Sequence, residues 1–215
     1  MSERPQSRFP LVPLLLAVAV GMATVACDSG GDNDAAPDVQ NEFSFDVTTV
    51  SASGEAVTAD EHETTLNGFS FFYEGTAPDT DEELFVVYFT EGDVLNEASS
   101  SEGLFGFVAR EGLRPQSGTY PFVSFESGGD VQSEFGMILF ENVGNVGTEG
   151  GSLSWYIVDG GTIDLTTASD ERVEGTISAE AINLTIDGTT SDSTRVTIDG
   201  TFTARNAESF VGFTP

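Results

Sequence analysis

The chain contains one cysteine and one histidine, Cys27 and His62, among its 215 residues. Nucleophilic catalysis of the Ser-His-acid type would have to use His62, which lies between Glu61 and Glu63, and no Gly-x-Ser-x-Gly motif accompanies it. One cysteine and one histidine also exclude a disulfide framework and the usual ligand sets of zinc. We therefore expect a non-enzymatic protein, and a hydrolase that uses His62 is the most distant alternative.

Carboxylates are the other side chains that could act in catalysis or bind a metal, and there are 36 of them. At that number a pair with the spacing of a glycosidase arises by chance and carries no information. Three oxygen-rich segments, Asp28–Asp38, Asp159–Asp164 and Asp187–Asp192, offer the hard ligands that calcium prefers, but none has the spacing of an EF-hand. We expect no cofactor, and calcium bound by one of these segments is the alternative.

The charge balance is strongly acidic, because the basic residues are seven arginines and the formal net charge is −29. A nucleic-acid partner is excluded, since phosphate binding needs a basic surface. Repulsion of this size destabilises a compact state unless salt screens it. The absence of lysine favours adaptation to a saline environment over simple tuning of solubility.

The first 26 residues have the pattern of an export signal. Arg4 and Arg8 precede an uncharged run of 13 residues, 14–26, which ends in small residues directly before Cys27. As a helix this run would be about 20 Å long, too short for a hydrocarbon core of about 30 Å. We predict a signal peptide over residues 1–26 that is removed after general secretion.

Thr24-Val25-Ala26-Cys27 resembles the lipobox of bacterial lipoproteins, although Thr24 stands where that motif most often has leucine. The resemblance implies that Cys27 is acylated and becomes the new N-terminus. Several acyl chains together hold a protein stably on a membrane. The membrane is then a partner through the N-terminal lipid, and we expect the protein outside the cytoplasm in the cell envelope, on the outer membrane or cell surface.

Residues 27–41 are expected to be the acylated cysteine and a flexible acidic tether. The segment after Cys27 has no aromatic residue and cannot bury enough apolar surface to fold. Its 14 residues reach roughly 20 Å, enough to hold a domain clear of lipid headgroups. Asp28 does not decide between the two membranes, because acidic residues at this place accompany either location. Loss of Arg4, Arg8 and Glu3 with the signal peptide leaves a net charge of −30.

Residues 42–215 are predicted to form one all-β domain, because short runs of Val, Ile, Thr, Phe and Tyr alternate with Gly, Asp, Ser and Asn. The gaps are too short for helical crossovers, so the strands should pair antiparallel. We expect a single antiparallel β-barrel or β-sandwich, with a slight preference for the barrel. About ten strands are expected, near residues 43–48, 69–74, 84–90, 104–110, 119–125, 135–141, 153–158, 162–165, 173–186 and 195–204.

Local patterns add detail to this domain. Asp159-Gly160-Gly161 has the composition of a tight hairpin between two strands. The apolar positions change from odd to even numbers near Ala181, which predicts a bulge there. Residues 51–66 and 91–102 are polar and are expected to be surface loops.

Two more features concern the strands themselves. Trp155 shares its parity with Leu153 and Ile157 and is expected in the core. The similar segments 173–180 and 198–205 both contain Gly-Thr, which we attribute to strand chemistry rather than to a solenoid repeat.

Over its leader and about its last hundred residues, the chain resembles a group of small, uncharacterised all-β lipoproteins of Gram-negative bacteria. The resemblance rests on the lipobox and on three segments, Ser117–Pro121, Gly160–Leu165 and Val196–Phe202. It implies an envelope β-domain and no particular activity. We expect a binding or structural role with a protein partner or ligand that the sequence does not identify. The many phenylalanines leave a second alternative, a barrel that carries a small apolar ligand.

Overall fold

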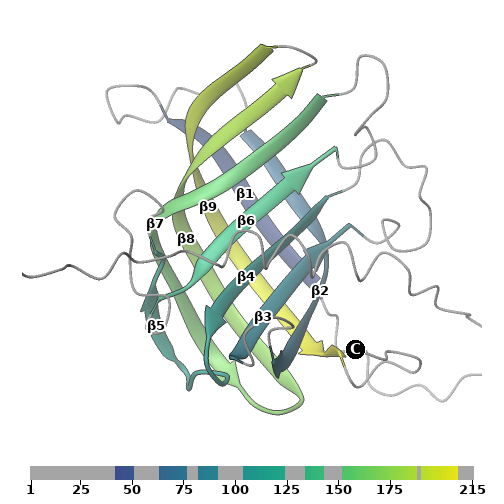
Figure 1. Cartoon of the computed structure of the whole chain (residues 1–215), viewed down its shortest axis with the longest axis vertical. Coiled ribbons are helices and arrows are strands. Elements are labelled where there is room, and N and C mark those ends of the chain that lie inside the picture. The colour runs from purple at the N-terminus through teal and green to yellow at the C-terminus, as the bar shows by residue number, and fades with distance from the viewer. Residues whose placement is uncertain are drawn as a thin grey trace, which may run out of the picture.

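The computed structural model describes residues 42–50, 63–76, 82–91, 104–123, 134–142, 152–187 and 190–207. These residues form nine strands that wind around one axis (Figure 1). The strands are β1 (Glu42–Val50), β2 (Glu63–Thr76), β3 (Glu83–Thr90), β4 (Phe105–Glu111), β5 (Gly118–Pro121), β6 (Gly136–Glu141), β7 (Ser152–Ala168), β8 (Arg172–Asp187) and β9 (Thr190–Asn206).

Eight of these strands close into an antiparallel barrel, as the preferred alternative of the sequence analysis predicted. Around the barrel the order is β7, β6, β4, β3, β2, β1, β9 and β8, and β8 pairs with β7 to complete the circle. The short β5 pairs with the second half of β7, beyond the end of β6. Where β1 begins, β2 and β9 approach each other directly and form a short parallel pairing at Phe71 and Arg205.

The barrel interior is filled by side chains of alternate residues from each strand. Phe43, Phe45, Phe89 and Phe202 form one cluster of rings, with centroids 4.9 to 5.7 Å apart. Rings at such spacings add favourable edge-to-face contacts to the burial of apolar surface. The described residues therefore form a packed core rather than a hollow lumen.

Two glycines make room for this core. A Cβ at Gly175 would lie 2.5 Å from the carbonyl oxygen of Asp164 and 3.1 Å from the ring of Phe202. A Cβ at Gly200 would lie 2.0 Å from the carbonyl oxygen of Ser44. The Gly-Thr segments of the two similar stretches thus serve close strand packing, which supports the attribution to strand chemistry.

The expected hairpin at Asp159-Gly160-Gly161 is wrong, because the chain runs straight through it as part of β7. The register shifts by one residue between Val158 and Gly160, where β7 pairs with Ala181 and Glu180 of β8. Gly161 has a φ of 102°, a conformation that residues with a Cβ rarely adopt. Asp and Gly here build a bulge, and the two strands expected near residues 153–158 and 162–165 are one.

A bulge was also expected in the strand that contains Ala181. The bulge lies instead in β7, opposite Ala181, so the predicted position is wrong. Along β8 the inward parity does not change: Ile177, Ala179 and Ala181 are all buried. Ile182 and Leu184 point outward instead, and they pair with Ile157 and Trp155. Trp155 is accordingly outside the barrel, against Phe140 at 5.3 Å, and its expected place in the core is also wrong.

The outer surface has an apolar band, which we call the outer band. Its rows follow the strand register from β2 through β3, β4, β6 and β7 to β8. One row is Phe71, Tyr88, Phe107, Ile138, Ile157 and Ile182, and the next is Phe69, Thr90, Phe105, Phe140, Trp155 and Leu184. The outer faces of β1 and β9 are polar, with Ser44, Asp46, Asp199 and Thr201 exposed.

The end of the barrel at which β2 begins is called the mouth, and the opposite end, with the turn between β7 and β8, is called the closed end (Figure 1). The loop expected over residues 51–66 ends earlier than predicted, because β2 starts at Glu63 and Leu66 is buried. Residues 51–62 and 92–102 lie outside the described residues. Within the described part of the chain, no helix is long and apolar enough to cross a membrane.

Candidate functional site

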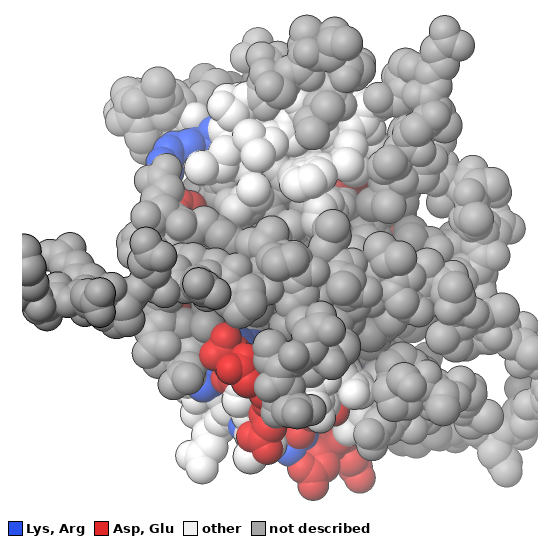
Figure 2. Space-filling view, viewed as in Figure 1, with Lys and Arg blue, Asp and Glu red and all other residues white. Residues whose placement is uncertain are grey.

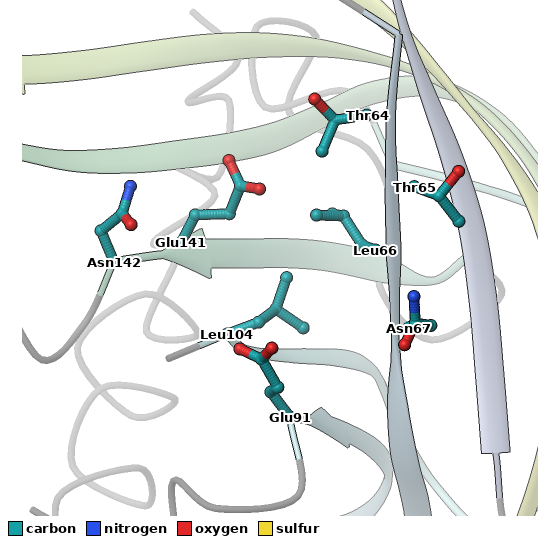
Figure 3. Close-up of a pocket in the computed structure, with 8 residues that line it drawn as sticks. All are labelled: Thr64, Thr65, Leu66, Asn67, Glu91, Leu104, Glu141 and Asn142. Carbon is teal, nitrogen blue, oxygen red and sulfur yellow. The ribbon is translucent and has the colours of Figure 1, made fainter. Parts of the chain in front are cut away.

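A pocket of about 210 Å³ lies at the mouth, among the starts of β2 and β4 and the ends of β3 and β6. Its lining is Thr64, Thr65, Leu66, Asn67, Glu91, Leu104, Glu141 and Asn142. Leu66 and Leu104 lie between the carboxylates of Glu141 and Glu91 (Figure 3). The pocket therefore combines a small apolar centre with two acids and several amide and hydroxyl groups.

Glu141 also marks the boundary between the pocket and the core. The hydroxyl of Tyr156, a core residue, donates a hydrogen bond to Oε2 of Glu141. Burial, together with this hydrogen bond and the charge of Glu141, raises the pKa of Tyr156 above its usual range, so the phenol stays neutral. Neither Glu141 nor Glu91 has an arginine partner among the described residues.

The closed end is organised differently, because Arg114 enters it from the segment between β4 and β5. Its guanidinium forms ion pairs with Glu74, at 2.8 Å, and with Asp170. It also donates a hydrogen bond of 2.7 Å to the carbonyl oxygen of Ser169 and lies 5.7 Å from the ring centroid of Phe72. One side chain thus joins β2, the turn between β7 and β8, and the core.

Arg110 strengthens the same end. Its guanidinium lies 5.5 Å from the ring centroids of both Tyr120 and Phe135, a geometry that favours cation–π attraction. The hydroxyl of Tyr120 in turn donates to the carbonyl oxygen of Gln116 at 2.8 Å. Figure 2 shows acidic and arginine side chains gathered at this lower end of the barrel. The contacts of both arginines are those of a structural closure rather than of a binding site.

None of the described residues that line the pocket was a candidate site residue of the sequence analysis. Cys27, the signal peptide (1–26), the tether (27–41), His62 and Asp28–Asp38 lie outside the described residues. Within β7, Asp159 lies 3.8 Å from Arg195, and Asp164 accepts a hydrogen bond of 3.3 Å from Thr119. Across the described ranges no three His, Cys, Asp or Glu side chains gather as metal ligands. Calcium at any of the three segments stays a prediction.

Sequence reasoning missed Glu91 and Glu141, because they are 50 residues apart and each is one of 36 acids. The sequence did offer one signal, which is position: each glutamate comes just after a continuous apolar run, residues 84–89 or 137–140, and so lies where a strand ends.

Comparisons of the chain with family models, with curated proteins and with solved structures gave no match.

Proposed function

We propose that this chain is a lipid-anchored cell-envelope lipoprotein with a non-enzymatic binding role, and that its mouth binds a small, positively charged molecule. The observation that carries the binding role is the pocket between Glu91 and Glu141, at one end of a barrel whose interior is otherwise filled. Two carboxylates that have no arginine partner in the described part of the chain favour a cation that brings its own positive charge.

The size of the pocket limits this ligand. Ligand pockets for drug-sized molecules usually measure about 300 to 1,000 Å³. The space here, about 210 Å³, corresponds to about seven water molecules at roughly 30 Å³ each. A short amine suits it, with its carbon chain against Leu66 and Leu104. The filled core gives less support to the alternative of a carrier that holds an apolar ligand inside the barrel.

The acidity of the mature chain supports the same class of ligand. A net charge of −30 attracts cations from a distance and raises their local concentration, an effect that salt screens. Diffuse attraction alone does not select a site, so the test must separate the pocket from the general charge.

Isothermal titration of the full chain with 1,5-diaminopentane tests the ligand class. Glu91→Gln and Glu141→Gln should each weaken binding about tenfold, the equivalent of about 1.4 kcal/mol. Glu83→Gln is the matched control, because it removes one exposed carboxylate at the closed end and should leave the affinity nearly unchanged. Equal weakening by all three variants would show diffuse attraction only, and absence of binding would exclude short amines.

The anchor is tested separately. Cys27→Ser should release the protein from the membrane fraction or leave it as uncleaved precursor, because the acylated side chain is lost. The covalent mass of the protein extracted from its own membrane should exceed that of the chain from residue 27 by its acyl groups. An unchanged mass and membrane fraction in the variant would contradict the anchor without affecting the binding test.

A further inference from the structure

The pocket at the mouth lies along the edge of a strand rather than on one face of the sheet. Its lining includes four successive residues of β2, Thr64, Thr65, Leu66 and Asn67. Successive side chains of a strand point to opposite faces. Leu66 is accordingly buried in the core, whereas Thr65 and Asn67 are exposed on the outside. A pocket that touches all four residues runs beside the backbone of β2, over about 10 Å at about 3.3 Å per residue.

This edge of β2 has no partner strand among the described residues. β1 pairs with β2 from Glu63 to Phe69, but the pairing of β3 with β2 begins only at Phe69. In a strand, every second residue directs both its N–H and its C=O to the same side. Residues 63–68, on the side away from β1, therefore present backbone donors and acceptors that no described strand uses. We call this side the open edge.

The pocket lies in a gap in the barrel wall between the open edge and the end of β6 (Figure 3). β3 and β4 stop at the floor of this gap, where the N–H of Glu91 donates a hydrogen bond of 3.1 Å to the carbonyl oxygen of Leu104. On the far side β6 ends at Glu141, and Asn142, with a φ of 61°, turns the chain out of the sheet. Neighbouring strands are about 4.8 Å apart, so β2 and β6, with β3 and β4 between them, are about 14 Å apart. That width is enough for one extended segment paired with β2.

The sequence of the open edge does not protect it from pairing. Exposed edges are usually blocked by lysine, by proline or by a bulge. Residues 63–68 contain neither lysine nor proline, and their register with β1 runs without a shift. The one charged side chain among them, that of Glu63, favours a basic partner over an acidic one. Such an edge is a template for β-augmentation, in which an extended peptide adds a strand to a sheet.

The charges of the pocket select the kind of segment. An N-terminal lysine carries its two ammonium groups on the same five-carbon chain as 1,5-diaminopentane, and it continues into a peptide backbone. We propose that the mouth binds an extended protein segment that begins with lysine. The two ammonium groups lie at Glu91 and Glu141, and the residues that follow add as a strand to the open edge. This inference rests on the proposed binding role of the mouth and names the partner.

Isothermal titration of the full chain with the peptide Lys-Val-Thr-Val-Thr amide tests the added strand. The peptide should bind about tenfold more tightly than 1,5-diaminopentane, because backbone hydrogen bonds add to the same two charges. Glu91→Gln should weaken the binding of both ligands by the same factor.

Methylation of the peptide nitrogens provides the matched control. N-methyl groups on the alternate residues whose N–H faces β2 should weaken binding about tenfold, and N-methyl groups on the intervening residues should have little effect. Amide hydrogen exchange of residues 64–67 should slow when the peptide binds and stay unchanged when the diamine binds.

The other outcomes overturn the proposal. If the peptide binds no more tightly than the diamine and both sets of N-methyl groups act alike, the mouth takes small amines only, and its proposed function stands. If neither ligand binds, the proposed function fails as well. Equal binding of Ala-Val-Thr-Val-Thr amide would mean that lysine is not recognised. If the chain alone sediments as a dimer in which the amides of residues 64–67 exchange slowly, the open edge pairs with a second copy.

Discussion

The two ends of the barrel differ in whether their carboxylates have arginine partners among the described residues. At the closed end Arg114 and Arg110 lie against rings and carboxylates and join strands that are distant in sequence. At the mouth Glu91 and Glu141 line a pocket that has no arginine among its described residues. Residues 27–215 contain only five arginines, and three of them, Arg114, Arg172 and Arg195, form ion pairs with carboxylates. Carboxylates left without a cation are the ones that remain available to a ligand.

The largest change in the free energy of unfolding is expected from removing the contacts of Arg114 at the closed end. Arg114→Ala leaves the half-buried Glu74 without its ion pair and should reduce the free energy of unfolding by about 2 kcal/mol. Urea unfolding at neutral pH measures this change. Arg195→Ala is the control, because Arg195 is 56% exposed and lies 3.8 Å from Asp159, so this pair should contribute at most about 0.5 kcal/mol. Equal losses in the two variants would remove the distinction between the ends.

An intermediate effect is expected where the core meets the mouth. Tyr156→Phe removes the hydrogen bond to Glu141 and should reduce the free energy of unfolding by about 1 kcal/mol at neutral pH. Tyr120→Phe is the comparison, because it removes a hydrogen bond at the closed end, the one to the carbonyl oxygen of Gln116. It should leave the affinity of the mouth for the amine unchanged, whereas Tyr156→Phe should change it, and titration with the amine measures the difference.

The same hydrogen bond predicts a dependence on pH. Because the pKa of Tyr156 is raised in the folded state, its contribution is fully present below the ordinary tyrosine pKa of about 10 and is lost as pH rises above it. The free energy of unfolding of the unmodified chain should therefore fall between about pH 9.5 and 11, and fall less in Tyr156→Phe. Parallel curves for the two proteins would contradict the assignment.

The smallest change in the free energy of unfolding is expected at the mouth, where a substitution should stabilise the protein. Glu91→Gln should raise the free energy of unfolding by about 0.5 kcal/mol at low ionic strength, because it removes one charge from an acidic surface. Added NaCl should stabilise the unmodified chain and reduce the gain from Glu91→Gln, and thermal melts across a salt series measure both. A destabilised variant would mean that Glu91 has a structural partner.

Much of the fold could be predicted because alternation marks the two faces of a strand. Alternation does not say which face is inside when both are apolar. In β7, Leu153, Trp155 and Ile157 point outward while Tyr156 and Val158 fill the barrel, and the more apolar set was assigned to the core. The bulge at Asp159 was mistaken for a turn because both use the same residues. To decide which face of a strand points inward, or whether a segment turns or bulges, one must know which strands pair with it. That pairing is known only once the barrel is closed.

The pocket could not be predicted for a related reason. Glu91 and Glu141 become neighbours of Leu66 through the strand order β2, β3, β4 and β6, which is a property of the whole sheet. Nothing in the residues next to either glutamate distinguishes it from an ordinary exposed acid.

The place of β1 between β2 and β9 has a consequence for how the chain folds. β7, β8 and β9 are long neighbours joined by short turns, so this meander forms from contacts local in sequence. β1 pairs with β9 across about 150 residues, a slow step that needs the last strand to be present. A chain that emerges with its N-terminus first would hold β1 to β4, with the aromatic outer faces of β2, β3 and β4, unclosed until β9 arrives. The window for aggregation is therefore set by the time needed to deliver the C-terminal strands, and chaperones that bind exposed β-strands would act during that interval.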